Sequence, residues 1–242
     1  MLRKIFLFLA WMPALVWAAN VAHPLDRANI DTSDVVSIQR GAHTFVNYCL
    51  NCHSAASMRY NRLMDLGLTE QQIIDNLLFA GAKIGDTMTI AASRQAQRKW
   101  FGAEPPDLSV IARSRGADWL YTYLRTFYRD ESRPSGWNNL VFPNVGMPHV
   151  FWQLQGTQIL KTEIEEHGGE KVEHRKLVLS APGELSPMAY DKLARDLVNY
   201  LSYMGEPEQA ERAQIGYFVL IFLFFLFVLS WLLKKEYWKD VH

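Results

Sequence analysis

A short run near the start of the sequence combines two thiols with an imidazole. The run YCLNCH, residues 48–53, holds Cys49 and Cys52, the only two cysteines in the 242 residues, followed directly by His53. A disulfide between residues three apart would close a very short loop and remove little entropy from the unfolded chain. A thioredoxin-like redox pair does not need the histidine, and a zinc site would need two further ligands at short spacing, which the sequence lacks.

This spacing fits covalent attachment of haem better than any of those alternatives. Two thiols three apart on a helical turn can each add to one vinyl group of a porphyrin, and the next residue can then present an imidazole to the iron. C-x-x-C-H is the attachment signature of c-type haem. The sequence therefore predicts one covalently bound haem c, linked through Cys49 and Cys52. His53 is the expected iron ligand, and its other ring N–H is expected to donate to a backbone carbonyl.

A second axial ligand is expected if the haem only carries electrons, because an open iron site binds exogenous ligands or peroxide. Met147 lies in the run FPNVGMPH, residues 142–149, where glycine and proline bracket it. A loop of this composition can hold one side chain in a fixed, extended pose. Met147 is the preferred candidate, and spacing alone leaves Met88 and His149 as rivals.

The elements that must position these residues are mostly helical. Apolar residues recur at three- and four-residue intervals over 34–50, which predicts a helix that is capped at Ser33-Asp34 and ends in the haem motif. Further helices are expected near 70–80, 89–99, 117–128, 187–204 and 209–236. Residues 157–166 and 171–180 alternate polar with apolar side chains and flank a Gly-Gly pair, which predicts a β-hairpin. Its tip is acidic, and both a docking patch for a basic electron acceptor and an ordinary solvated loop are compatible with that charge.

Both ends of the chain carry apolar segments. Residues 1–19 combine a basic start with a short apolar run and small residues, the pattern of a cleaved secretory signal peptide; the run is short for a retained anchor, which needs about 20 apolar residues. Residues 214–233 form the expected transmembrane anchor, because 215–233 carry no charge and a helix rises about 1.5 Å per residue. Lysines follow within 234–242, so this tail is expected in the cytoplasm and residues 20–213 form the extracytoplasmic haem domain.

The formal net charge of zero gives no argument for binding nucleic acid.

The ordered motifs resemble those of the cytochrome c1 family, the membrane-anchored cytochrome of the quinol–cytochrome c oxidoreductase (bc1) complex, in its bacterial form. The resemblance rests on QRGAHTFVNYCLNCHSAASMRYNRL (39–63), AKIGDTM (82–88), WFGAEPPDLSVIARSRG (100–116), NVGMPHVFWQLQG (144–156), DLVNYLSYMGEPEQAER (196–212) and the C-terminal apolar run. It implies a mainly α fold: a cytochrome c-like helical haem domain with a small β-hairpin excursion, plus one C-terminal transmembrane helix.

The resemblance also implies roles for single residues. Cys49 and Cys52 become the thioether links, His53 the proximal ligand and Met147 the distal ligand. Pro106 lies in a segment near the haem edge. An arginine near the haem propionates is expected, with Arg115 the better match and Arg113 second, and a solvated surface arginine is the alternative for either. Trp119, Tyr121 and Tyr123 are expected to pack either on the porphyrin or in the ordinary core.

The implied function is electron transfer. The chain would accept one electron from a Rieske iron–sulfur protein and pass it to a soluble or membrane-bound cytochrome c, with no bond chemistry of its own. Its partners would be cytochrome b and the Rieske protein, in a dimeric complex of the bacterial inner membrane, with the haem domain in the periplasm. The alternatives are a free-standing tethered shuttle to a terminal oxidase and, from another class, a haem enzyme or gas sensor with an open iron site.

Overall fold

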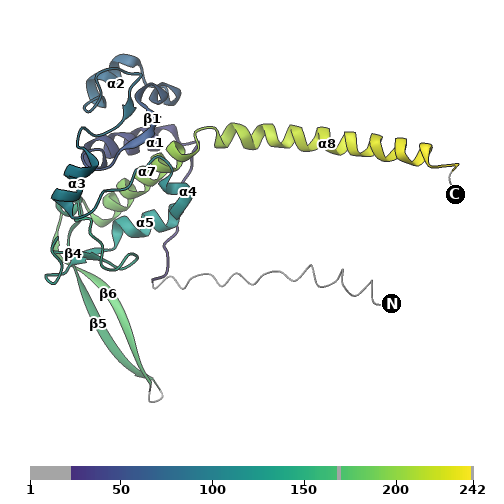
Figure 1. The fold of residues 1–242 in the computed structure, drawn as a ribbon. Helices are drawn as coiled ribbons and strands as arrows, with labels where there is room; N and C mark the ends of the chain where they lie inside the picture. Colours follow the sequence, from purple (N-terminus) through teal and green to yellow (C-terminus); the bar gives the residue numbers. More distant parts are fainter. Residues whose placement is uncertain (1–22, 168–169, 241–242) are drawn as a thin grey trace.

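The computed structural model describes residues 23–167 and 170–240. The expected signal peptide, residues 1–19, lies outside this range, as does the Gly-Gly pair at the hairpin tip. The described chain forms a helical head from which one long helix and one hairpin extend in different directions (Figure 1). The mainly α prediction is confirmed. The helices are α1 (Val35–Thr44), α2 (Glu70–Asn76), α3 (Arg94–Phe101), α4 (Ile111–Arg115), α5 (Ala117–Arg125), α6 (Trp152–Gln155), α7 (Pro187–Gly205) and α8 (Gln209–Tyr237).

Local capping chemistry sets several helix starts. The Asp34 carboxylate accepts a hydrogen bond from the Ser37 amide at 2.9 Å, as the predicted cap requires. Thr69 and Gln72 form a capping box at the start of α2. Ser186 caps α7, and Pro187 occupies its first turn, where a missing N–H leaves no bond unmade.

Three predicted helices end or begin elsewhere. The helix expected over 70–80 stops at Asn76, and the one expected over 89–99 begins only at Arg94, where Ser93 caps it. The helix expected over 117–128 stops at Arg125 because the next residues pair as a strand. Tertiary pairing overrides local helix propensity at this point.

The strands of the described chain form two-stranded antiparallel sheets. They are β1 (Ala55–Arg59) with β2 (Thr87–Met88), β3 (Phe127–Arg129) with β4 (Trp137–Asn139), and β5 (Gly156–His167) with β6 (Glu170–Pro182). The predicted hairpin is β5–β6, with Ile159 opposite Val178. The other two pairs were not predicted, because strands of two to five residues are too short to show an alternating pattern.

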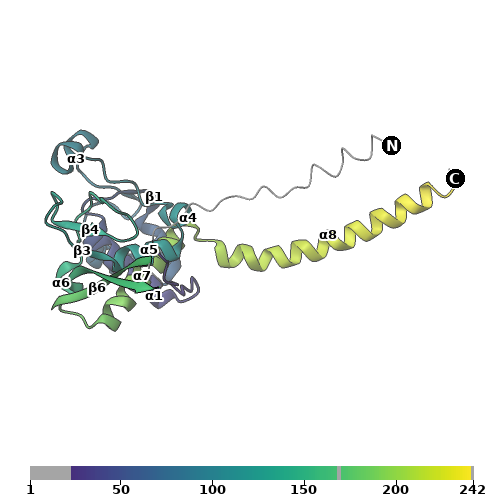
Figure 2. The ribbon, with the colours of Figure 1, turned by 90° about the horizontal axis from the view of Figure 1, so that it is seen from below.

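The head is organised around the crossing of α1 and α7, which lie side by side in Figures 1 and 2. Gly41 is at the closest approach: a Cβ there would lie 2.0 Å from the carbonyl oxygen of Asp196 and 2.7 Å from Cβ of Tyr200. Only a glycine permits this spacing. The crossing brings the end of α1, and therefore the haem motif, onto the buried core.

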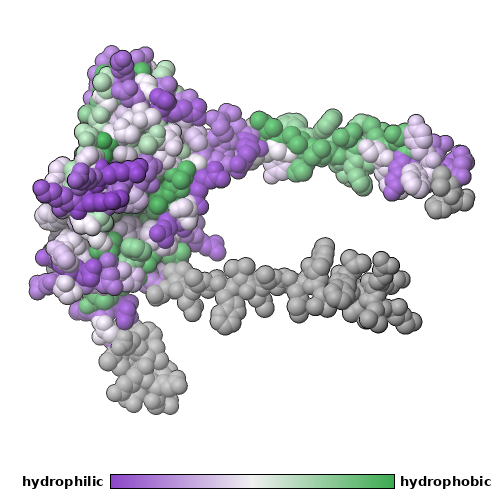
Figure 3. Space-filling model, in the orientation of Figure 1, coloured by the Kyte–Doolittle hydropathy of each residue, from purple (hydrophilic) through white to green (hydrophobic). Residues whose placement is uncertain are grey.

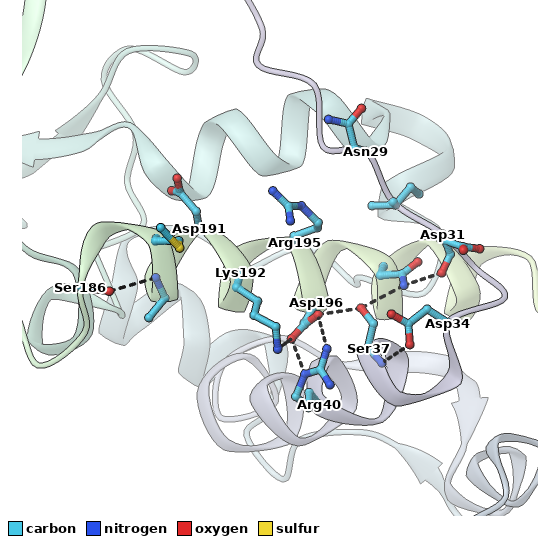
Figure 4. Close-up of a pocket in the computed structure, with 14 residues that line it drawn as sticks. Asn29, Asp31, Asp34, Ser37, Arg40, Ser186, Asp191, Lys192, Arg195 and Asp196 are labelled. Carbon is cyan, nitrogen blue, oxygen red and sulfur yellow. Dashed lines mark hydrogen bonds and ion pairs between the residues drawn. The ribbon is translucent and has the colours of Figure 1, made fainter.

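A groove of about 540 Å³ runs between the N-terminal segment, α1 and α7. In Figure 4, Arg40, Ser37 and Lys192 point toward Asp196. The Asp196 carboxylate accepts hydrogen bonds from Arg40 at 2.6 Å and from Ser37 at 2.7 Å, and its side chain is 8% exposed. This network ties α1 to α7 beside the glycine contact.

The C-terminal helix α8 leaves the head with its apolar side chains exposed. Within Ile215–Tyr237, an 18-residue window has a mean hydropathy of 2.6, and none of that window is buried against the head. Figure 3 shows a continuous hydrophobic surface along α8 with hydrophilic residues at both ends. A helix of this length and composition can cross a membrane. The predicted boundary between the haem domain and the anchor, at 213/214, falls inside α8. The domain limits stay predictions.

Candidate haem-binding site

The haem motif sits where α1 changes its winding. After Thr44 the helix continues as a five-residue π-helical turn, Phe45–Cys49, and the carbonyl of Cys49 then accepts the amides of Cys52 (3.1 Å) and His53 (2.8 Å). Such π-helical turns occur frequently at functional sites. Both thiols are free, with Cys49 buried and Cys52 half-buried. Burial raises the pKa of the Cys49 thiol to about 12, so the thiol is neutral at physiological pH.

The imidazole of His53 is held by the backbone. Its Nδ1 lies 2.8 Å from the carbonyl oxygen of Pro106, which can only accept, so Nδ1 carries the proton. The unprotonated Nε2 is then available as a ligand. Burial lowers the pKa of His53, which favours the neutral ring that a metal requires. The predicted hydrogen bond to a backbone carbonyl is therefore present, and Pro106 supplies it.

The Pro106 carbonyl is fixed by a second set of hydrogen bonds. The Asp107 carboxylate accepts the amides of Ala56 and Ser109, each at 2.8 Å. The Leu108 amide donates to the carbonyl of Ser54 at 2.8 Å. These bonds join the segment after the haem motif, residues 54–56, to residues 105–108. Sequence reasoning did not identify this role of Asp107, although an acidic residue directly after two prolines is a recognisable signal for a turn.

Met147 lies in a loop between two buried residues, Val145 and His149. The Asn144 amide donates to the side chain of Asn138 at 2.8 Å. The Met147 side chain is half-buried, and its sulfur accepts a hydrogen bond from the Tyr123 hydroxyl at 3.3 Å. A stiff loop that presents a thioether is the arrangement that an axial methionine needs.

The rival ligands occupy packed positions. Met88 is fully buried in the main core, where the Tyr200 hydroxyl donates to its sulfur at 3.3 Å. His149 is 1% exposed and stacks on Phe127 with ring centroids 4.9 Å apart. Burial lowers its pKa to about 4, so the ring is neutral. Of the three candidates, Met147 is half-buried whereas Met88 and His149 are buried, and Met147 stays the preferred candidate.

The two candidate arginines lie in different surroundings. The Arg115 guanidinium lies over the rings of Trp119 (5.1 Å) and Phe142 (5.9 Å), next to the aromatic residues that lead to Met147. Arg113 lies beside the end of α7, where a Cβ on Gly205 would be 3.3 Å from its Cγ. Both are exposed, and neither forms an ion pair with a carboxylate in the part of the chain that the structure describes. This arrangement favours Arg115 as the propionate partner.

The residues present fit a haem c. Two free thiols share one turn, an imidazole has one nitrogen engaged and the other available, and a thioether is offered by a stiff loop. Among residues 23–167 and 170–240, no three His, Cys, Asp or Glu side chains gather into a separate metal site.

Comparison with known proteins identifies the family of this chain. The model of the cytochrome c1 family matches residues 26–157 and 183–241. The chain belongs to the cytochrome c1 family. Members of this family are the haem c-carrying electron-transfer subunits of the bc1 complex, where they are membrane-anchored beside cytochrome b and the Rieske protein, and they carry one covalently bound haem c.

Individual relatives are similar over the whole chain. Cytochrome c1 of Allochromatium vinosum is 50% identical over 244 residues, covering 100% of both chains. A protein of Nitrosomonas europaea named ammonia monooxygenase gamma subunit is 48% identical over 242 residues, covering 100% of this chain and 99% of the relative. The mitochondrial cytochrome c1 haem protein of Saccharomyces cerevisiae is 26% identical, covering 95% of this chain and 72% of the relative. The relatives that are 50% and 48% identical carry different names. The family assignment rests on the matched ranges, which cover the head and the anchor.

The matched ranges omit residues 158–182, which are nearly the whole β5–β6 hairpin. The family match therefore does not include most of the hairpin. The acidic tip of the hairpin is the candidate docking patch. Most of its acidic side chains lie outside the part of the chain that the structure describes, so the docking patch stays a prediction.

Proposed function

We propose that this chain accepts one electron from the Rieske protein and passes it to a c-type cytochrome, soluble or membrane-bound. Its haem would be linked through Cys49 and Cys52, with His53 and Met147 as axial ligands. The observation that carries this ligand set is the His53–Pro106 hydrogen bond beside two free thiols, because it leaves one imidazole nitrogen available to a metal. When bound, the haem supplies a one-electron couple, and His/Met ligation gives it the raised potential that a Rieske donor requires.

The protein residues have supporting tasks. Pro106 sets the His53 tautomer, and Arg115, or Arg113 as second choice, would pair with a propionate through its guanidinium. We further propose that residues 1–19 are a signal peptide, that the head at 20–213 is periplasmic, and that 214–233 span the inner membrane. Residues 234–242 would lie in the cytoplasm. The lysines that follow the span support this orientation, and the complex is proposed to be dimeric.

Purification from native membranes tests the assembly. A tag on the C-terminus and mild detergent would recover the chain with its stable partners. We expect b-type haem and an iron–sulfur signal in the same fraction as the c-type band, at a mass that fits two copies of each subunit. A fraction with c-type haem alone would instead support the free-standing tethered shuttle and would contradict the proposed function.

Replacing the distal ligand tests the iron site. Met147→Ala should lower the reduction potential and allow carbon monoxide to bind the reduced haem, because it removes a thioether that favours the reduced state. The wild-type chain should bind carbon monoxide poorly. Ready binding by the wild type would contradict the carrier function and favour a haem enzyme or sensor.

A further inference from the structure

The side chain of Tyr123 ends on the sulfur of the proposed distal ligand. Its hydroxyl donates to Sδ of Met147 at 3.3 Å, a normal distance for a hydrogen bond to sulfur. Within the described residues this hydroxyl has no other hydrogen-bond partner. The contact joins α5 to the Met147 loop across 24 residues of sequence.

The tyrosine ring is fixed from both sides. It stacks on Trp119, with centroids 4.9 Å apart and planes 10° apart, and it meets the edge of Phe127 at 5.0 Å. Its backbone carbonyl also accepts the side-chain amide of Asn139 at 2.8 Å. Because the ring and the backbone of Tyr123 are both constrained, its hydroxyl already points at the Met147 sulfur before a haem is bound.

A thioether sulfur has two lone pairs, so it can bind a metal with one and accept a hydrogen bond with the other. A hydrogen bond draws electron density from the sulfur and weakens its donation to iron. Weaker donation destabilises ferric iron more than ferrous iron, because the more positive ion depends more on its ligands. Hydrogen bonds in the second coordination sphere tune metal centres in this way.

We propose that Tyr123 is a positioning and tuning residue, whose hydrogen bond to Met147 raises the reduction potential of the haem. This inference rests on Met147 being the distal ligand. The order of contacts from Arg115 through Trp119 and Tyr123 to Met147 also links the candidate propionate partner to the axial sulfur through one packed row.

The chain contains a matched control. Tyr200 donates to Sδ of Met88, also at 3.3 Å, inside the main core. Tyr200→Phe therefore removes the same chemical contact from a sulfur that is not the proposed ligand. Tyr200 is fully buried and Tyr123 half-buried, so any general effect of deleting a tyrosine hydroxyl on packing should be at least as large in Tyr200→Phe.

The test compares redox titrations of the full-length haem protein in detergent for wild type, Tyr123→Phe and Tyr200→Phe. The oxidised spectra report the sulfur-to-iron charge-transfer band at long wavelength. We expect Tyr123→Phe to keep this band and to shift the ferrous/ferric equilibrium several-fold toward ferric haem, where a tenfold change in a one-electron couple equals 59 mV. Tyr200→Phe should leave the potential unchanged.

Each other outcome overturns the inference in a recognisable way. An unchanged potential in Tyr123→Phe, or equal shifts in both variants, shows that the hydrogen bond does not tune the haem. Loss of the band in Tyr123→Phe alone shows that the tyrosine holds the ligand in place without tuning it. Absence of the band in the wild type shows that Met147 is not the ligand, and then the proposed ligation fails together with the inference.

Discussion

Asp196 is a buried carboxylate that the fold keeps charged. Burial acts to raise its pKa, but hydrogen bonds from Arg40 and Ser37 outweigh burial, and the net shift is downward. A carboxyl whose folded pKa lies below its unfolded value of about 3.9 stabilises the protein above that pH. This stabilisation is lost as the pH falls through the folded pKa. The group that ties α1 to α7 therefore makes the head sensitive to acid.

We predict that Asp196→Asn lowers the free energy of unfolding by roughly 2–3 kcal/mol at neutral pH, because it leaves Arg40 without its anionic partner. The difference from wild type should shrink as the pH falls below about 4. Thermal unfolding followed by circular dichroism at several pH values measures both effects. Lys192→Gln is the control, since Lys192 is 59% exposed and lies 3.8 Å from the same carboxylate. A pH-independent difference between Asp196→Asn and wild type would show that charge is not the cause.

At the scale of elements, the α1–α7 crossing depends on one missing side chain. Gly41→Ala would place a methyl group 2.0 Å from a backbone oxygen of α7, which a side-chain rotation cannot relieve. We predict a loss of about 3 kcal/mol or more in stability, and poor haem incorporation because the haem motif ends this helix. The haem content of purified protein, measured by absorbance, reports it. Gly85→Ala, with no atom within 4 Å of the new Cβ, should behave like wild type; equal behaviour of both variants would contradict the close-packing argument.

The β5–β6 hairpin is a separate element in energetic terms. Its base is held to the head by the Gln158 side chain, which donates to the carbonyls of Arg125 and Phe127 at 2.9 Å each. Isolated two-stranded hairpins are marginally stable in water. Among the described side chains, none from residues 157–182 belongs to the hydrophobic core, so we expect the core of the head not to need the outer part of this hairpin.

We predict that the hairpin can be shortened without loss of the haem. Replacing residues 159–178 by an Asn-Gly turn between Gln158 and Leu179 keeps a paired position and the two base hydrogen bonds. The variant should retain the absorption spectrum and reduction potential of the wild type, because no proposed ligand lies in the removed segment. A changed potential or a loss of haem would show that the hairpin supports the site.

Sequence predicted those parts of the molecule that depend on local chemistry. The haem motif, the cap at Asp34 and the apolar helix α8 all leave a signal within a few neighbouring residues. The end of α5 and the strands β1 to β4 leave no such local signal, because they depend on pairing partners elsewhere in the chain. The pairing of Tyr123 with Met147 was missed for the same reason: an aromatic residue on a helix gives no sign of which side chain its hydroxyl meets.

At the scale of the whole molecule, the head and α8 are joined by a short connection. Only residues 206–208 separate α7 from α8. Arg212 forms an ion pair with Glu206 across this connection, and Arg62 of the head pairs with Glu208 at 2.7 Å. Ion pairs therefore lie on both sides of the connection.

We predict that a chain ending after Glu208 is released from membranes with its haem, because the apolar surface of α8 is not buried against the head. Separation of membranes by centrifugation, followed by a reduced-minus-oxidised spectrum of the supernatant, measures the release. A c-type band that stays in the pellet would show that the head itself holds to the membrane or to its partner subunits.

The short connection between α7 and α8 also affects how long each electron transfer takes. A head on a flexible tether would have to find its donor and its acceptor by swinging between them, and each turnover would include that search. With only three residues between α7 and α8, we expect the orientation of the head to be set when the complex assembles. The time per turnover would then depend on how fast the proposed partners bind and leave, and lengthening these three residues should add a search step.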